Sequence, residues 1–326
     1  MRLRIAIVIF MLSSFFLAIP HGVGAEQQGA SKESSEIISK ILALPETVLY
    51  PGSKPLSAVV GDRDLRRLLL DNWRVDSPAG RQKLLDLLVL VAQDRTTGRA
   101  HYRLNDAEVA SALLSALDDQ DVRLSMRATN LLSTALDESL VRFYAGEIVR
   151  IVKEHANTDA ILLLGRTGSI EAVALLKDDK RYAAASQRKV ELALAKLGDA
   201  EFQAKFIQEF AIRRDPRKKM QLANDLAYIG SRQACRAIAG ELRSPEIIRA
   251  GASYSIRVFY IDSLSKALPQ EKALRKPKEE DIRRNGDSYY DAVEKWAIGA
   301  LGVSWDKPRP PFYWMMPEPG KPEREE

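Results

Sequence analysis

The feature that most constrains this chain is an internal repeat with a period of about 30 residues. Three copies can be aligned by eye: Leu162–Ser169, Leu192–Asp199 and Asn224–Ser231. Each copy contains a glycine near its end, and Gly168, Gly198 and Gly230 recur at a nearly constant spacing. Glycine closes a helix because it adopts the left-handed backbone without a steric penalty. The next residue is Ser or Asp, which caps a following helix. The pattern therefore predicts a helix, a tight turn and another helix, repeated.

The same period extends on both sides of these copies. The first helices of successive units are predicted to begin near Ala107, Ser139, Ile170, Ala200 and Arg232, which are almost evenly spaced. A regular period between about 20 and 50 residues is typical of a solenoid. Aromatic residues make up only 7% of the chain, while Ala and Leu are plentiful, and this composition favours helix over strand. The predicted fold is all-α, an α-solenoid of stacked antiparallel helix pairs.

The repeat also resembles a known family. The turn Leu117-Asp118-Asp119-Gln120-Asp121-Val122-Arg123 and the Leu-x-x-(Leu/Ile)-Gly-(Asp/Ser) helix endings are similar to those of HEAT repeats, especially the short class found in phycobilin lyase subunits. The resemblance covers residues 105 to 262. It departs from the pattern at Thr167, where an apolar residue is usual, and at the 137–138 junction, which lacks a glycine. It implies a HEAT/ARM-like superhelix and says little about function.

Residues 1–25 have the three parts of a secretory signal peptide. Arg2 and Arg4 precede an apolar run, Ile5–Ile19, and small residues lead up to Ala25. The run is short for a membrane span of about 20 residues. Cleavage after Ala25 is therefore predicted, which places the mature chain in the periplasm or outside the cell. The other interpretation is an uncleaved anchor, and membrane association is expected only in that case.

The rest of the chain divides into five predicted regions: an N-terminal helical region at 26–104, the repeat solenoid at 105–268, a charged linker at 269–286, a helix at 287–304 and a tail at 305–326. Three local predictions concern the first region. Pro45–Val60 is predicted as a loop, Asp62 as the cap of a helix over Leu65–Trp73, and Ser77 as the start of the next helix. A long helix is predicted over Ser244–Leu268.

Charge argues against nucleic acid as a partner. Without Arg2 and Arg4 the chain keeps 47 Lys and Arg residues against 44 Asp and Glu residues, a net charge of +3. Nucleic-acid binding normally shows as a strongly basic domain or patch. The mature chain therefore lacks that charge signature.

The sequence offers little for catalysis or metal binding. His101 and His155 are the histidines of the mature chain, and neither has a matching carboxylate spacing. Cys235 is the single cysteine, which excludes an internal disulfide, and its neighbours suggest a buried apolar role. Motifs for a nucleophile elbow, a phosphate loop or a zinc protease are absent from the sequence. No catalytic residue, metal or cofactor is predicted.

Two regions are predicted to contact a binding partner. The first is a basic cluster around the Asp215-Pro216 turn, with an extension along the next helix: Arg213, Arg214, Arg217, Lys218, Lys219, Arg232 and Arg236. It suits an acidic protein face, an anionic glycan or lipid head groups, and a solvated helix junction is the plainer interpretation. The second is the tail, whose aromatic residues are Trp305, Phe312, Tyr313 and Trp314. The tail either caps the last helices or docks onto a partner.

These observations favour an exported, non-catalytic scaffold that mediates protein–protein interaction in the cell envelope. The partner is a protein of unknown identity with an acidic surface, and contacts are expected on the second helices of the units, at Arg123, Arg127, Arg188, Lys219 and Arg249. One alternative is a lyase-like or accessory enzyme, in which the loop residues His101, Tyr102 and Arg103 would meet acids of the repeat. Another is a structural envelope protein anchored by residues 5–19.

The N-terminus of the mature chain tests the predicted export. Cleavage after Ala25 leaves Glu26 as the first residue. Mass spectrometry of the protein isolated from its source cells should find Glu26 at the N-terminus. A chain that still begins at Met1 would instead support the anchored envelope protein.

Overall fold

A computed structural model describes residues 32–93, 104–155, 157–178, 180, 182, 186–243, 253–275 and 279–306, with side chains omitted at 253–256 and 279–287. Within these ranges the regular structure is helical, and the one β-type contact is an isolated bridge between Leu104 and Leu136. The prediction of an all-α chain is confirmed. In the same ranges, no helix combines the length and the apolar character that crossing a membrane requires.

The helices follow one another closely along the chain. The N-terminal region contains α2 (Lys32–Ala43), η1 (Glu46–Val48), α3 (Lys54–Val60), α4 (Leu65–Asn72) and α5 (Pro78–Ala92). The middle contains α6 (Ala107–Leu117), α7 (Val122–Thr134), α8 (Glu138–Phe143), α9 (Ala145–Glu154), η2 (Thr158–Ala160), α10 (Ile161–Arg166), α11 (Ile170–Asp178) and α13 (Gln187–Lys196). The last part contains α14 (Ala200–Ile212), α15 (Pro216–Ile229), α16 (Arg232–Gly240), η3 (Glu241–Arg243), α18 (Ser253–Ala267), η4 (Lys272–Leu274), α19 (Glu279–Trp296) and the π-helical turn η5 (Ala297–Leu301).

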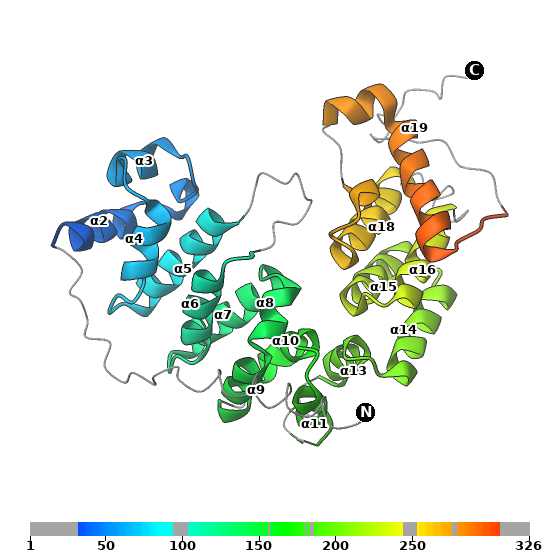
Figure 1. The fold of residues 1–326 in the computed structure, drawn as a ribbon, viewed down its shortest axis with the longest axis horizontal. Helices are drawn as coiled ribbons and strands as arrows, with labels where there is room; N and C mark the ends of the chain where they lie inside the picture. The colour runs from blue at the N-terminus through cyan, green and yellow to red at the C-terminus, as the bar shows by residue number, and fades with distance from the viewer. Residues whose placement is uncertain are drawn as a thin grey trace, which may run out of the picture.

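Packing is mainly between helices that are close in sequence. Helix α13 contacts α14, α14 contacts α15, and helices one step further apart also meet, as α13 with α15 and α14 with α16. Figure 1 shows the helices along a curved path, with the α2 and α19 ends rising on the same side. Helices α9 and α11 lie outside the bend, while α8, α15 and α18 face its inner side. The molecule therefore has an inner and an outer side.

The predicted unit boundaries agree with the helix starts. Helices α6, α11, α14 and α16 begin at the predicted residues, and α8 begins one residue early, at Glu138. The backbone φ angles of Gly168, Gly198 and Gly230 are +68°, +103° and +67°, so these glycines adopt the left-handed region expected of helix-closing residues. The residue after each glycine accepts a hydrogen bond from a backbone N–H of the next helix. The turn chemistry read from the sequence is confirmed.

The apolar faces of the helices form two clusters that meet at α13. Val190 and Leu194 belong to the N-terminal cluster, whereas Leu192 and Ala195 belong to the C-terminal one. Cys235 is fully buried in the second cluster, and burial raises the pKa of its thiol to about 11. The predicted apolar role of this cysteine is confirmed.

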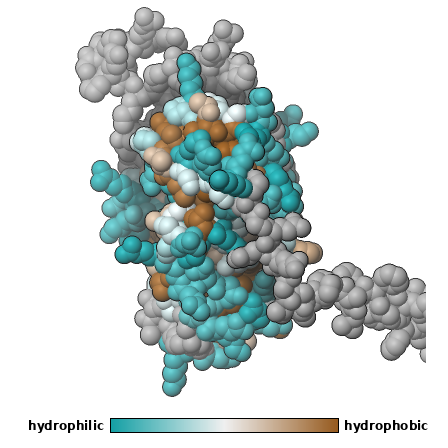
Figure 2. Space-filling model, turned by 90° about the vertical axis from the view of Figure 1, so that its left-hand side faces the viewer, coloured by the Kyte–Doolittle hydropathy of each residue, from teal (hydrophilic) through white to brown (hydrophobic). Residues whose placement is uncertain are grey.

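The end of the molecule formed by α2, α3 and α4 is only partly covered. Figure 2 faces this end and shows apolar surface running down its middle, between hydrophilic sides. Partly buried apolar side chains of these helices include Leu42, Val59 and Leu70. Exposed apolar surface is expected at the end of a stack of helices.

Three predictions about local structure were wrong. Asp64, and not Asp62, caps α4, because its carboxylate accepts the Arg67 N–H. The segment Pro45–Val60 is not one loop, since Ser53 caps α3 over its second half. The charged segment 269–286 is not a continuous linker, since it contains η4 and the start of α19. Glu, Lys and Arg are good helix formers, and later turns of α19 bury Tyr290 and Val293. The predicted helix start at Ser244 lies outside the described residues.

One close contact between units requires a glycine. A Cβ atom at Gly165 in α10 would lie 2.9 Å from the Ala193 Cα of α13 and would collide with the Tyr228 hydroxyl of α15. That hydroxyl donates a 2.5 Å hydrogen bond to the Leu162 carbonyl. The absence of a side chain at Gly165 therefore lets three helices meet.

We predict that Gly165→Ala lowers the free energy of unfolding by about 1 to 3 kcal/mol, because the Ala193 backbone cannot move aside without strain. Gly146→Ala is the matched control. Gly146 also lies in a helix, and a Cβ there has nothing within 4 Å, so alanine should be neutral or stabilise by up to about 1 kcal/mol. Urea unfolding followed by circular dichroism measures both. Equal effects of the two substitutions would contradict the packing argument.

Candidate functional site

The basic cluster predicted around the Asp215-Pro216 turn is only partly a surface. Arg214, Arg217 and Lys218 are exposed or half-exposed, and Asp215 caps α15 by accepting the backbone N–H groups of Arg217 and Lys218. Lys219 is 5% exposed. Its ammonium lies 2.8 Å from the Glu241 carboxylate and 5.3 Å from the centre of the Phe210 ring. Lys219 is therefore inside the helix stack and apart from the exposed members of the cluster.

The extension of this cluster lies at the other end of α15. Arg232 follows the C-terminus of α15, which at 14 residues is about 20 Å long. Arg232 is exposed and donates to the Ala300 carbonyl, while Arg236 is exposed on the next turn of α16. Arg213, at the end of α14, is half-buried. The seven predicted residues therefore do not form one continuous surface.

Basic residues predicted on the second helices are paired with acids of neighbouring helices. Arg127 of α7 donates to Asp86 of α5 at 2.7 Å. Arg188 of α13 donates to Asp225 of α15 at 2.7 Å, and also to Glu209 of α14 at 3.0 Å. Arg123 is exposed on α7, and Arg249 lies outside the described residues. Arg127 and Arg188 thus join neighbouring helices.

Trp305 is the one aromatic residue of the predicted tail site that the structure describes. Its indole N–H donates to the Gly240 carbonyl at 3.1 Å, and the Arg243 guanidinium lies 4.9 Å from its ring centre. It therefore packs on the end of α16. Phe312, Tyr313 and Trp314 lie outside the described residues, as do His101, Tyr102 and Arg103. His155 is exposed, and its ring nitrogen lies 2.7 Å from an Asp118 carboxylate oxygen.

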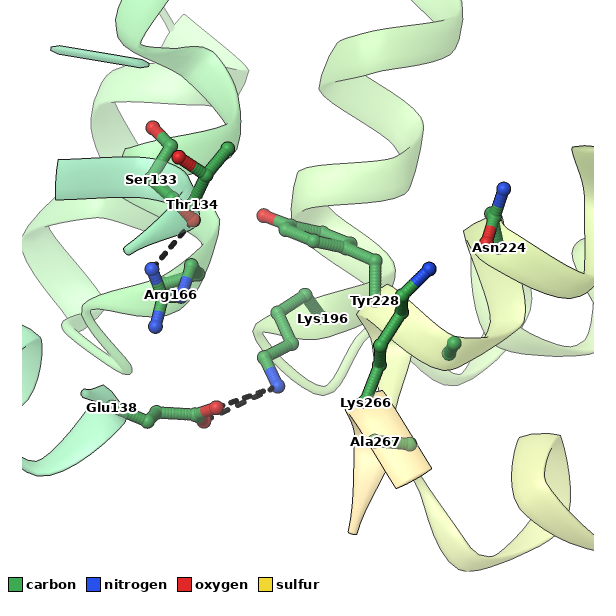
Figure 3. A pocket seen from close by; sticks show the side chains of 10 residues that line it. Ser133, Thr134, Glu138, Arg166, Lys196, Asn224, Tyr228, Lys266 and Ala267 are labelled. Atoms are coloured by element: carbon green, nitrogen blue, oxygen red, sulfur yellow. Dashed lines mark hydrogen bonds and ion pairs between the residues drawn. The ribbon is translucent and has the colours of Figure 1, made fainter. Parts of the chain in front are cut away.

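A polar pocket that the sequence did not single out is lined in part by α8, α15 and α18, the helices that face the inner side of the bend (Figures 1 and 3). Its volume is about 320 Å³, and it adjoins a hollow of about 660 Å³. The pocket is lined by Ser133, Thr134, Glu138, Arg166, Lys196, Asn224, Ala227, Tyr228, Lys266 and Ala267. The hollow shares Glu138, Lys196 and Ala267 with it and adds Arg142 at its wall. We call the two together the inner pocket.

Four residues of the inner pocket occupy one position of the repeat. Thr134, Arg166, Lys196 and Tyr228 follow one another at the period of the units. The last three each stand two residues before a helix-closing glycine. The fold brings this position together at the C-terminal ends of α7, α10, α13 and α15. The glycine spacing is the sequence signal for this alignment, because the residue two positions before each closing glycine has the same place in every unit.

Arg166 has a structural role in the pocket. Its side chain is buried and donates to the Leu132, Ser133 and Leu136 carbonyls at 2.6 to 2.8 Å. The last carbonyls of a helix have no partner within the helix. Arg166 therefore caps the end of α7 from the following unit.

Lys196 and Arg142 share one carboxylate. The Lys196 ammonium lies 3.2 Å from one Glu138 oxygen and 3.3 Å from the other, and Arg142 donates to Glu138 at 2.8 Å. Burial lowers the pKa of Lys196 and outweighs the attraction of Glu138. Burial acts to raise the pKa of Glu138, but Lys196 and Arg142 outweigh it, so that pKa is lowered. The lowered pKa keeps Glu138 a carboxylate at neutral pH.

Tyr228 is not available for proton transfer. Its hydroxyl donates to the Leu162 carbonyl, and burial raises its pKa far above the ordinary value of 10. Neither histidine nor cysteine is among the residues that line the inner pocket. Among the described residues, no group of three or more His, Cys, Asp or Glu side chains could hold a metal ion. The arrangement suits the binding of an anion better than acid–base chemistry.

Comparison with known proteins gives no relative. No protein family, no curated protein and no solved structure matches this chain. The resemblance to HEAT repeats therefore rests on the turn and helix-end residues quoted above.

We predict that Glu138→Gln lowers the free energy of unfolding by about 2 to 3 kcal/mol, because Lys196 then remains buried without a carboxylate. The double variant Glu138→Gln/Lys196→Met should be within about 1 kcal/mol of the wild type, since a packed apolar residue replaces the pair. Urea unfolding near pH 7 measures both variants. A double variant as unstable as the single one would show that the ion pair itself holds the fold.

The stability of Glu138→Gln relative to the wild type is also expected to depend on pH. A carboxyl group with a lowered pKa adds stability that is full above its ordinary value of 4.5 and is lost as pH falls through the lowered pKa. We therefore expect the deficit of Glu138→Gln against the wild type to shrink when unfolding is repeated in acid. A deficit independent of pH would contradict the ion-pair explanation.

Proposed function

We propose that the mature chain is an exported α-solenoid of HEAT-like units, located in the periplasm or outside the cell, that binds a protein partner on its inner side. The observation that carries this proposal is the inner pocket, where the buried Arg166 and the half-buried pair of Lys196 and Glu138 lie among helices on the inner side of the bend. The signal-like residues 1–25 support export, and the period of about 30 residues supports the solenoid.

The cost of the buried charges supports a binding role. A buried ion pair adds little stability compared with packed apolar side chains of similar size. The Lys196 side chain is 14% exposed and that of Glu138 is 25% exposed, so both have lost most of their water. Apolar residues could fill this position of the stack, as they fill the neighbouring core. Retention of the pair is therefore better explained by something that the inner pocket binds.

The lyase-like alternative gains no support from the pocket. Tyr228 donates its proton to the Leu162 carbonyl, and Lys196 is paired with the Glu138 carboxylate. A reaction at this place would need a group that accepts or delivers protons near neutral pH. Binding by shape and charge needs none.

We expect the mature chain, used as bait with a crosslinker in the envelope fraction of its source cells, to enrich a specific protein. The variant Arg142→Glu should lose that protein because it reverses a charge at the inner pocket. The variant Arg214→Glu/Arg217→Glu/Lys218→Glu, which reverses the exposed basic turn, should keep it. Quantitative mass spectrometry compares the three baits.

Loss of the protein with the basic-turn variant, together with its retention by Arg142→Glu, would instead place the binding site at the basic turn that the sequence predicts. Circular dichroism of each bait checks that a lost interaction is not caused by unfolding of the variant. Enrichment of no protein by the wild-type bait would contradict the scaffold function.

A further inference from the structure

We infer that the inner pocket receives a carboxylate side chain from an acidic segment of the protein partner, held by Arg142 at the mouth and Lys196 inside. This inference rests on the proposed scaffold function and adds the chemistry of recognition to it. Three observations carry it: the balance of charge, the unused donors and the shape of the walls.

The charge of the inner pocket favours an anion with a single charge. Its walls carry four basic side chains, Arg142, Arg166, Lys196 and Lys266, against two acidic ones, Asp137 and Glu138. Lys266 also pairs with Asp262 at 2.9 Å, one turn earlier on α18. The excess of positive charge is therefore small, and Glu138 would repel a dianion such as phosphate. A monoanionic carboxylate matches this balance.

Lys196 and Arg142 have donors left for a ligand. An ammonium has three N–H groups and a guanidinium has five. Among the described residues, Glu138 is the hydrogen-bond partner of both side chains. One carboxylate cannot occupy eight N–H groups, so most of them face water or the hollow. A second carboxylate can therefore bind beside Glu138, with bidentate contacts to Arg142.

The two cations differ in their access to a ligand. The Arg142 side chain is 64% exposed, whereas that of Lys196 is 14% exposed. Figure 3 shows Lys196 and Glu138 pointing into the same space between the helices. A carboxylate that enters would meet Arg142 first and lose water as it reaches Lys196. Charge-assisted hydrogen bonds of this kind strengthen where water is excluded.

The walls fit the rest of a peptide segment. Ala227 and Ala267 line the pocket, and Ile229, Leu268 and Pro269 line the adjoining hollow. These apolar groups can contact the methylene carbons of a glutamate and the backbone around it. Together the two spaces hold far more than one carboxylate, so an acidic side chain within a longer segment is favoured over a small free acid.

Fluorescence anisotropy with two labelled decapeptides tests this inference on the mature chain. One peptide alternates Glu and Ser, and the other has Gln in place of every Glu. We expect only the Glu peptide to bind the wild type. Its affinity should fall at least tenfold for Arg142→Gln and for Glu138→Gln/Lys196→Met, and the second of these keeps the net charge of the protein.

A control variant separates the pocket from general attraction between charges. Lys54→Gln/Lys153→Gln removes two exposed cations, one of them on α9 outside the bend. It should change the affinity less than twofold. Equal losses in the control and in the pocket variants would overturn the inference. Displacement of the Glu peptide by inorganic phosphate at equal or lower concentration than by acetate would overturn the assignment to a carboxylate.

The crosslinking experiment keeps the two proposals distinct. A protein captured by the wild-type bait, combined with no binding of the Glu peptide, would contradict the carboxylate pocket and leave the scaffold function standing. Binding of the Glu peptide that depends on Arg142 and Lys196, combined with capture of no protein, would contradict the scaffold function and leave the pocket standing.

Discussion

The structure depends on side chains that satisfy backbone carbonyls of a preceding unit. The last carbonyls of each helix have no partner within it, and burying them unpaired would cost about 1 to 3 kcal/mol each. Arg166 donates to the end of α7, Tyr182 donates to Val152, and Tyr290 donates to Leu242. Tyr228 donates to the Leu162 carbonyl near the start of α10, 66 residues away in the sequence, and so adds a bond between units at a carbonyl that is not at a helix end. These bonds join helices that are 30 to 66 residues apart in the sequence.

The sequence predicts the structural features that depend on a few consecutive residues. Helix-closing glycines and the caps after them depend on a few consecutive residues, so the starts of α6, α11, α14 and α16 were predicted correctly. The error at Asp62 is small, since Asp64 two residues later offers the same side chain. The error at residues 269–286 has another cause. A run of charges indicates exposure but not the absence of a helix, and α19 has an apolar side further along its length.

The sequence does not predict where long charged side chains lie in the fold. Lys219 stands among four other basic residues, so the sequence groups it with them. The α-helical period turns it inward, where Glu241 and Phe210 receive it. Glu138 and Lys196 are 58 residues apart, and only the tertiary fold brings them together. Tertiary partners decide whether a charge belongs to a surface, to a joint between units or to a pocket.

One departure of the repeat from its own pattern explains why Lys196 differs from Arg166. Both residues occupy the same position of the repeat, but the Arg166 guanidinium donates to the Leu132, Ser133 and Leu136 carbonyls. The residue equivalent to Leu132 in the next unit is Leu164, and its carbonyl accepts the Thr167 hydroxyl at 2.6 Å. Thr167 stands where an apolar residue is usual. The Leu164 carbonyl is thereby satisfied within its own unit, and the Lys196 ammonium turns towards Glu138 and the inner pocket.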